Sequence, residues 1–246
     1  MKLALIGDPV EHSRSPQLHE RFLEEAGIEG TYTAIQVKRG HGLDTLQRLK
    51  AEGYTGANVT TPLKEEVMSF CDELDEDARM AEAVNTIFFG RNVLGSNTDG
   101  AGARSALETL LGQSVALERV GILGTGATAR AILAQLHETD AYTYVWGRDE
   151  DKVLALCDRF EANRWPESPP EIVISTLPPK TDLPKHILEH VRKADLVMDS
   201  NYGERSTLEL IVHREVVKGD LMLEAQARAS FDFWLAHAQE EAEEIL

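Results

Sequence analysis

Short apolar runs alternate along this chain with segments whose apolar residues recur every three or four positions. Apolar or alternating runs predict strands over Lys2–Gly7, Thr31–Val37 and Thr55–Val59. A helix is predicted from Ser15 as its N-cap, with Pro16 at its first position and Gly27 after its end. Further elements are a helix marked by Leu43, Leu46 and Leu49 and closed by Gly53, a helix over Glu65–Cys71, and a hairpin of Val84–Phe89 with Val93–Ser96. This alternation predicts an α/β fold with a mainly parallel sheet.

The pattern starts again after Asp99. Helices are predicted over Ala101–Leu111, Thr128–Leu136, Glu150–Phe160 and Leu221–Ile245. Strands are predicted over Arg119–Leu123, Tyr142–Trp146, Ile172–Ser175 and Leu196–Asp199. Strand–helix–strand units of this kind predict a Rossmann-type dinucleotide-binding domain.

Composition narrows the classes of protein. The 246 residues carry a net charge of -17, which disfavours nucleic acid or an anionic membrane as a partner. The N-terminal apolar run is too short for a signal peptide, and we expect no membrane span and a cytoplasmic location. The two cysteines and eight histidines show no metal-ligand spacing, so we expect free thiols and no metal site.

Four polar segments in the first hundred residues carry the candidate chemistry. They are Gly7–Pro16, Asn58–Lys64, Ala83–Thr86 and Asn97–Gly100, and a glycine turn follows at Gly124–Gly126. In this order and spacing the chain resembles the shikimate dehydrogenase family. The resemblance implies a substrate-binding domain over residues 1–100, a Rossmann domain over residues 101–219, and a C-terminal helical segment over residues 220–246 that packs back on the first domain.

Ser13 and Ser15 lie just before a predicted helix N-terminus, where hydroxyls and unpaired N–H groups suit a carboxylate. The alternative is a simple cap and a loop residue. The resemblance implies that both serines bind the substrate carboxylate.

Neutral polar residues suited to a ring with several hydroxyls are Thr60, Asn85 and Gln226. Taken alone, each of these residue types more often has a structural role, which is the alternative. The resemblance implies that all three, together with Tyr202, bind the substrate.

Lys64 and Asp99 are the candidate catalytic pair. Oxidising a secondary alcohol requires a group that takes up the hydroxyl proton, and the reverse reaction requires a donor. A lysine oriented by an aspartate meets both needs, whereas the alternative is a surface ion pair worth ~0–1 kcal/mol.

The candidate cofactor residues are Gly124, Thr125, Gly126, Ala127, Arg148 and Asp149. The glycine turn follows a strand and opens a helix, as in pyrophosphate-binding turns. The arginine favours the 2′-phosphate of NADP, while the aspartate favours the bare ribose of NAD. The alternative for Arg148 and Asp149 is an ordinary helix start.

The resemblance implies a shikimate dehydrogenase that reduces 3-dehydroshikimate with NADP, with NAD as the second option, acting as a monomer or homodimer. Hydride would then pass between substrate and nicotinamide in the cleft of the two domains. The rivals are a paralogue that acts on quinate or uses NAD, motivated by Asp149, and a binding or regulatory protein on the same fold. The second rival is motivated by altered cofactor-half segments such as Ile174–Pro179 and Gly219–Leu223.

Overall fold

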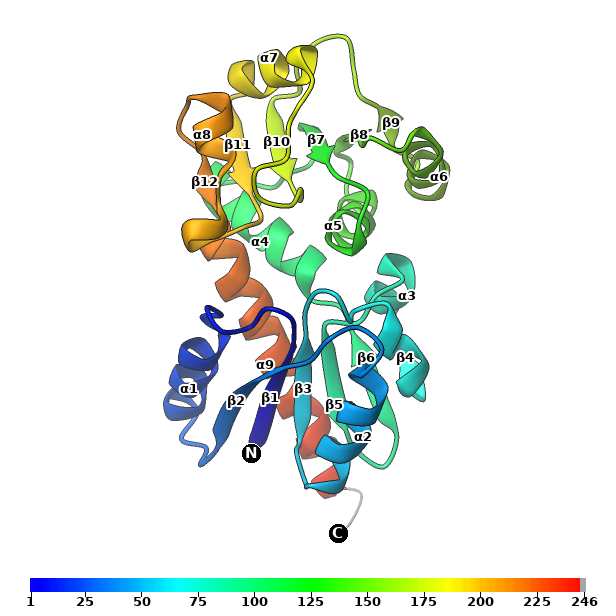
Figure 1. Cartoon of the computed structure of the whole chain (residues 1–246), viewed down its shortest axis with the longest axis vertical. Coiled ribbons are helices and arrows are strands. Elements are labelled where there is room, and N and C mark those ends of the chain that lie inside the picture. The colour runs from blue at the N-terminus through cyan, green and yellow to red at the C-terminus, as the bar shows by residue number, and fades with distance from the viewer. Residues whose placement is uncertain (244–246) are drawn as a thin grey trace. The chain divides into compact units, whose positions relative to one another are not determined.

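The computed structural model describes residues 1–243, which form two compact units. The first unit comprises Met1–Asp99 and the chain from Gln226 onward, and the second comprises Gly100–Ala225. Each unit is built around one six-stranded sheet (Figure 1). The predicted α/β fold class is confirmed.

The first unit contains the sheet β2-β1-β3-β5-β6-β4, in which β1 is parallel to both β2 and β3. The hairpin β5–β6 is antiparallel, as the sequence predicts. The strands are β1 (Lys2–Gly7), β2 (Thr31–Gln36), β3 (Gly56–Val59), β4 (Glu73–Leu74), β5 (Thr86–Phe89) and β6 (Val93–Ser96). The helices are α1 (Ser15–Glu25), α2 (Gly42–Ala51), the 3-10 helix η1 (Glu66–Phe70), α3 (Glu76–Ala81) and the long α9 (Asp220–Glu243).

Helices cover both faces of this first sheet. Alternate residues of β1 point to opposite faces, so Leu3 and Leu5 pack with α1 and α9, while Ala4 and Ile6 pack with α2 and η1. In Figure 1, α2 lies in front of these strands and α9 behind them. Coverage of both faces explains why β1 is a continuous apolar run.

The start of α1 differs from the prediction. Ser15 is the first helical residue, and the N-cap is Arg14, which makes no side-chain capping bond. The hydroxyl of Ser13 instead accepts a hydrogen bond from the N–H of Ser15 at 3.2 Å. A polar side chain two residues before the helix therefore satisfies one of its unpaired N–H groups.

The turn after β3 also differs from the prediction, because Glu66–Phe70 forms a short 3-10 helix rather than a regular α-helix over Glu65–Cys71. Only Val67 is buried in this segment, so little apolar packing favours a longer helix.

Helix α9 packs against the first sheet through Ala227, Phe231 and Trp234, which recur at the i, i+4, i+7 spacing of one helix face. The indole N–H of Trp234 donates to the carbonyl of Ile87 in β5 at 2.8 Å. The last predicted helical residues, 244 and 245, lie outside the described residues.

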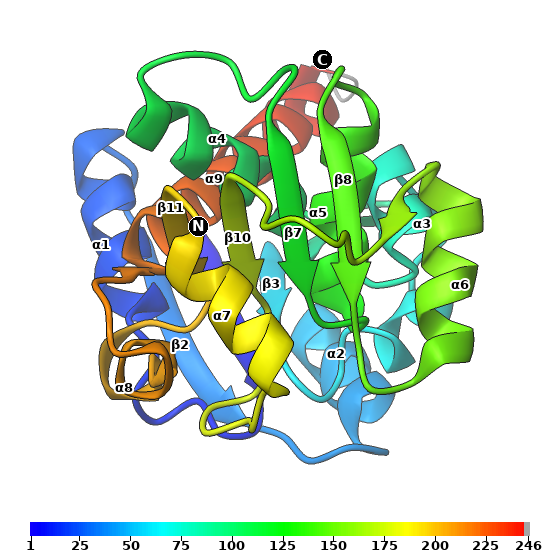
Figure 2. The same cartoon turned by 90° about the horizontal axis from the view of Figure 1, so that it is seen from above.

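The second unit has a fully parallel sheet, ordered β12-β11-β10-β7-β8-β9. Figure 2 shows its four central strands, β11, β10, β7 and β8, side by side. The strands are β7 (Arg119–Leu123), β8 (Tyr142–Trp146), β9 (Asn163–Arg164), β10 (Ile172–Ser175), β11 (Leu196–Asp199) and β12 (Val217–Lys218). The helices are α4 (Asp99–Leu111), α5 (Ala127–His137), α6 (Glu150–Phe160), α7 (Lys185–Lys193), the 3-10 helix η2 (Gly203–Arg205) and α8 (Leu208–Val212). This strand order is that of a Rossmann sheet, with the order reversing between β7 and β10.

The longer strands of the second unit were all predicted, whereas α7 and the short β9, β12 and α8 were not. Helix α7 buries Ile187 and Val191 against Val173 and Val197 of the sheet. No helix of the described chain is long and apolar enough to cross a membrane. Within residues 1–243, no cluster of His, Cys, Asp and Glu side chains could hold a metal ion.

Candidate active site

The polar segments of the first hundred residues follow or precede strands that end at one side of the first sheet, which we call its edge; the strands are labelled in Figure 1. Strand pairing aligns Ile6 with Val59, Asn58 with Thr86, and Thr86 with Ser96. Strands β1, β3 and β6 therefore end at the edge where β5 begins. The sequence motifs that follow or precede these strands meet there for that reason.

Glycine permits the closest approach at this edge. A Cβ atom at Gly7 would lie 2.3 Å from Cγ2 of Thr60 and 2.9 Å from the carbonyl oxygen of Thr61, so a larger residue would force this turn to move. The end of β1 thus sits against the turn after β3, and the N–H of Asp8 donates to the carbonyl of Thr61 at 2.9 Å.

Lys64 and Asp99 form a shielded ion pair at the same edge. The Nζ of Lys64 donates a short hydrogen bond to Oδ2 of Asp99, and the two side chains are 13% and 8% exposed. The carbonyl of Lys64 accepts from the N–H of Val84 at 2.8 Å, which fixes the lysine backbone. Asp99 is the first residue of α4, where a helix dipole favours a carboxylate. This burial distinguishes the pair from a solvated surface ion pair.

Asn85 connects this pair to Gln226. Its Nδ2 donates to Oδ1 of Asp99 at 2.8 Å and lies 3.4 Å from Oε1 of Gln226. Its Oδ1 accepts from the backbone N–H of Thr98 at 2.9 Å, which fixes the orientation of the amide. Four of the predicted site residues are thus joined in one hydrogen-bonded set.

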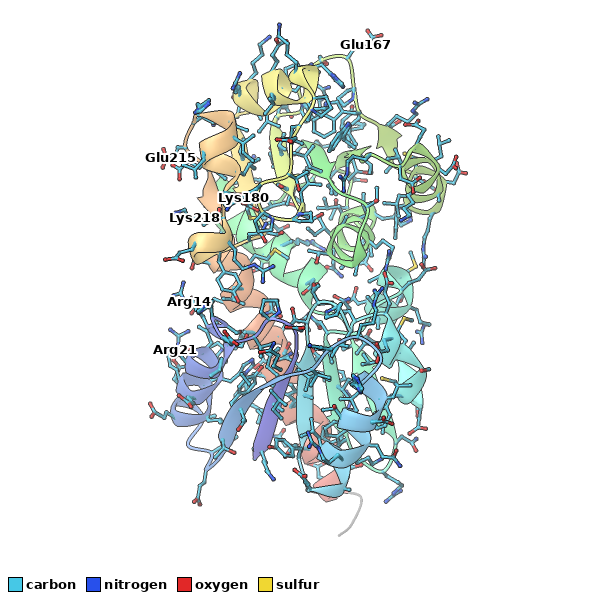
Figure 3. All side chains as sticks on the ribbon, viewed as in Figure 1. Arg14, Arg21, Glu167, Lys180, Glu215 and Lys218 are labelled. Carbon is cyan, nitrogen blue, oxygen red and sulfur yellow. The ribbon has the colours of Figure 1, made fainter. Side chains whose placement is uncertain are left out.

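Ser13 and Ser15 lie in the segment that follows β1, and their hydroxyls are 3.2 Å apart. Arg14 stands with them at the N-terminal end of α1 (Figure 3). Two hydroxyls, an arginine and the positive end of the α1 dipole suit an anionic group.

Thr60, in the turn after β3, also belongs to the first unit, whereas the other predicted residues belong to the second. Tyr202 is half-buried and precedes η2, and the N–H of Arg205 donates to its carbonyl at 3.3 Å. Its assignment to the substrate stays a prediction.

The glycine turn lies at the carboxyl end of β7, next to the point where the strand order reverses. Gly124 has a φ of 121°, and a Cβ there would lie 2.3 Å from Oγ1 of Thr176, so only glycine fits. Gly126 is the N-cap of α5, and a Cβ there would meet no atom within 4 Å. The backbone at Gly126 therefore faces open space at a helix N-terminus, which fits a dinucleotide pyrophosphate.

Arg148 and Asp149 follow β8, the neighbour of β7 in the sheet. The carboxylate of Asp149 caps α6, accepting from the N–H of Lys152 at 3.3 Å. Arg148 is exposed, and within the described chain its side chain makes no hydrogen bond or ion pair. The capping role predicted as the alternative for this segment is thus present at Asp149, while Arg148 is available to a ligand.

Sequence reasoning missed four buried polar residues at this edge, Asn58, Thr86, Thr98 and Ser230. Asn58, Thr86 and Thr98 lie inside motifs that were recognised, but no role was assigned to them. Ser230 follows Gln226 by one helical turn on the buried stripe of α9, and that spacing is the signal that could have identified it.

His19 is a fully buried polar residue on α1 beneath this edge. Its ring stacks on Tyr32 with 4.4 Å between the centroids, and neither ring nitrogen has a hydrogen-bond partner among the described residues. Burial lowers the pKa of His19 from 6.5 to about 3, with the neighbouring Asn58 opposing this shift and Arg228 adding to it. The folded protein therefore holds this imidazole neutral.

The unfolding free energy of the wild-type protein should therefore decrease more steeply, as the pH is lowered, than that of a variant without this histidine. Because the folded pKa lies below the unfolded one, His19 contributes no pH-dependent loss above about pH 6.5, and stability is lost as the pH falls towards 3. One such proton changes the unfolding free energy by about 1.4 kcal/mol per pH unit. Between pH 7 and pH 5, urea unfolding of wild type should lose about 2 kcal/mol more than His19→Leu.

The exposed His41→Leu variant is the matched control and should follow wild type. Equal losses for wild type and His19→Leu would contradict a neutral, buried imidazole.

Fold and site together define an α/β protein with one dinucleotide-binding unit and one unit that carries a shielded lysine–aspartate pair. The family model described as the shikimate dehydrogenase substrate binding domain matches residues 5–87. An NADP(+) shikimate dehydrogenase of Methanococcus aeolicus is 30% identical over 254 residues, covering 94% of this chain and 91% of the relative. This chain belongs to the shikimate dehydrogenase family, as its motifs predict.

Solved structures agree with this assignment. The crystal structure of shikimate dehydrogenase from Aquifex aeolicus has a TM-score of 0.83 and 26% identity, covering 95% of this chain and 92% of that one. A shikimate dehydrogenase from Thermus thermophilus, solved in complex with NADP(H) and shikimate, has a TM-score of 0.83 and 25% identity, with both chains covered completely.

Proposed function

We propose that this protein is an NADP-dependent shikimate dehydrogenase, which reversibly reduces 3-dehydroshikimate to shikimate in the pathway to the aromatic amino acids. The observation that carries the proposal is the shielded pair of Lys64 and Asp99, bonded through Asn85 to Gln226. This set lies in the unit that contains the match to the substrate-binding domain of the family.

The proton of the reaction is assigned to Lys64. NADPH, when bound, supplies the hydride for reduction of the ketone. The ammonium of Lys64 holds a proton at Nζ that the substrate oxygen takes up, and the amine accepts it in the reverse direction. Asp99 orients Nζ through its Oδ2 and balances its charge, while its other oxygen is held by Asn85.

The substrate is held by complementary polar groups. Asn85, Gln226 and Thr60 bind ring hydroxyls, and Tyr202 is assigned to the same substrate. Ser13 and Ser15 bind the carboxylate, supported by the charge of Arg14 and the N-terminus of α1. An anionic, hydroxylated ring therefore matches the chemistry of the residues assigned to it.

The residues of the second unit fit the cofactor. The open backbone at Gly126, with Gly124, Thr125 and Ala127, would hold the pyrophosphate at the start of α5. Arg148 would hold the 2′-phosphate, since its guanidinium is exposed and unpaired among the described residues. Asp149 is engaged as the cap of α6, which weakens the argument that it selects NAD.

Steady-state assays test this proposal directly. Shikimate oxidation with NADP+ should proceed with a higher kcat/KM than quinate oxidation or any reaction with NAD+. Activity with quinate alone, or preference for NAD+, would favour the paralogue. Shikimate binding without turnover under any cofactor would favour a binding or regulatory protein.

Arg148→Ala should raise the KM for NADP+ by roughly 10–150-fold, the equivalent of one lost bond to a charged group. The KM for NAD+, which has no 2′-phosphate, should stay unchanged. Lys185→Ala removes an exposed positive charge from α7 of the same unit and serves as the control. A parallel rise in both KM values would show that Arg148 acts on the fold and not on the phosphate.

Asp149→Ser separates the charge of this residue from its capping bond, since serine also caps helices. If the carboxylate repels the 2′-phosphate, the ratio of kcat/KM for NADP+ over NAD+ should rise in this variant. An unchanged ratio would show that Asp149 acts as a helix cap and does not influence the choice of cofactor.

The proposal includes a cytoplasmic location and an oligomeric state. Both cysteines, Cys71 and Cys157, are free thiols, in keeping with a reducing cytoplasm. We expect a monomer or a homodimer, which sedimentation analysis would distinguish.

A further inference from the structure

Three buried hydroxyl groups meet beneath Asn85. The Oγ of Ser230 lies 2.7 Å from Oγ1 of Thr86 and 3.0 Å from Oγ1 of Thr98. These residues come from α9, from β5 and from the segment before α4, and none is more than 6% exposed. We call Thr86, Thr98 and Ser230 the hydroxyl cluster.

The hydroxyl cluster fixes the orientation of Asn85. The hydroxyl of Thr86 donates to Oδ1 of Asn85 at 2.8 Å, and the backbone N–H of Thr98 donates to the same oxygen at 2.9 Å. With its oxygen held by two donors, Asn85 turns Nδ2 towards the carboxylate of Asp99. A flipped amide would bring N–H groups against donors and leave Asp99 facing an oxygen.

Ser230 joins this arrangement to helix α9. Its Oγ is 3.0 Å from the carbonyl of Gln226, one helical turn earlier, and accepts from Nδ2 of Asn58 at 3.1 Å. Asn58 is itself oriented, because its Oδ1 accepts from the hydroxyl of Tyr32 at 2.7 Å. Ser230 therefore ties the helix that carries Gln226 to the strands that carry Asn58 and Thr86.

Because these hydrogen bonds are buried, they favour one orientation of each side chain. In a site closed to water, a polar atom that loses its partner is not compensated by solvent, so alternative side-chain orientations are disfavoured. The rotation of α9 about its axis and the orientation of Asn85 are consequently coupled. The amide of Gln226 stands 3.4 Å from Nδ2 of Asn85 as a result.

We propose that Ser230 is a positioning residue for the reaction, whose hydroxyl acts through Thr86 and Thr98 to hold the amide of Asn85 where it meets a ring hydroxyl of the substrate. This inference rests on the proposed shikimate dehydrogenase activity. Ser230 itself has no contact with substrate in this assignment. Its effect should therefore appear in substrate binding and disappear when Asn85 is removed.

The first test is Ser230→Ala, measured by steady-state kinetics and by calorimetric titration with shikimate. The KM and Kd for shikimate should rise about 5- to 20-fold, as for loss of a buried hydrogen-bond partner, while the KM for NADP+ stays unchanged. Ser96→Ala removes another buried hydroxyl from the same unit, outside the hydroxyl cluster, and controls for general loss of stability.

The second test is a double-mutant cycle with Asn85→Ala. Because Ser230 acts through Asn85, Ser230→Ala should raise the shikimate Kd less than 2-fold in the Asn85→Ala background. The same 5- to 20-fold loss in both backgrounds would overturn the inference, as would a Ser230→Ala protein with lowered Tm and unchanged shikimate affinity.

A third pair of variants guards against a Ser230→Ala protein that fails to fold. Thr86→Val preserves shape and removes the hydroxyl that bonds to Asn85, whereas Thr86→Ser preserves the hydroxyl. Thr86→Ser should retain several-fold tighter shikimate binding than Thr86→Val; equal affinities would overturn the inference. A wild-type protein that neither binds nor oxidises shikimate would instead overturn the proposed function, and the inference with it.

Discussion

Lys64→Ala should lower kcat at least ~10²-fold, the lower range for a positioned acid–base group. The reason is that Nζ of Lys64 is the proton carrier and is already aligned by Asp99 and shielded from water. Shikimate affinity should change much less, because the hydroxyl and carboxylate contacts assigned to the other residues remain. Both quantities are measured by steady-state kinetics and calorimetric titration.

Lys50→Ala, which removes an exposed lysine on α2 of the same unit, is the control and should behave as wild type. Asp99→Asn should also lower kcat, with a larger rise in KM since this carboxylate is expected to touch the substrate. If the pair acts as one unit, the double variant should be little worse than the poorer single variant. A near wild-type kcat for Lys64→Ala would remove the lysine from the mechanism.

Trp234→Ala should destabilise the first unit by about 3–5 kcal/mol, the range for deleting a large buried aromatic side chain. Trp234 is fully buried on α9, packs in the core that includes Leu3 and Phe22, and donates to the carbonyl of Ile87. Its loss leaves a cavity and an unpaired carbonyl in the sheet. Urea unfolding measures the loss of free energy, and hydrogen exchange of the backbone amides of β1 and β3 measures the loss within this sheet.

Trp234→Phe should lose less stability, because it retains most of the apolar contact and gives up the indole hydrogen bond. The half-buried Leu235→Ala, on a neighbouring position of α9, is the matched control and should lose less still. A Trp234→Ala protein whose β1 and β3 exchange as slowly as in wild type would show that α9 contributes little to this unit.

The local sequence pattern was enough to predict the elements that bury a continuous apolar run. Strands β7, β8, β10 and β11 were predicted with the residues at which they begin and end, because parallel strands covered on both faces consist of consecutive apolar residues. Helix α7 was missed because it buries only Ile187 and Val191, although that i, i+4 pair after Pro184 was a usable signal.

The residues of the candidate site could be predicted from the sequence, but the hydrogen bonds between them could not. Each motif has a local signature, so Ser13, Lys64, Asn85 and Asp99 could be named from the sequence and the family resemblance. Which side chains bond to which depends on strand register and helix packing, and both join residues far apart in the chain. The bond between Asn85 and Gln226, separated by 141 positions, is such a case.

The sequence by itself therefore determined the α/β class, the alternating strands and helices of the Rossmann-type second half, the family, and the candidate residues, since these depend on periodicity and short motifs. Only the tertiary structure decided that Asp149 caps a helix, that His19 is buried without hydrogen-bond partners among the described residues, and that Ser230 meets Thr86 and Thr98. The identity of a serine, a histidine or an aspartate does not say whether its side chain is solvated by water or buried in the protein. Its role is set by which distant groups the sheet register and helix packing bring to it, and by how much water they exclude.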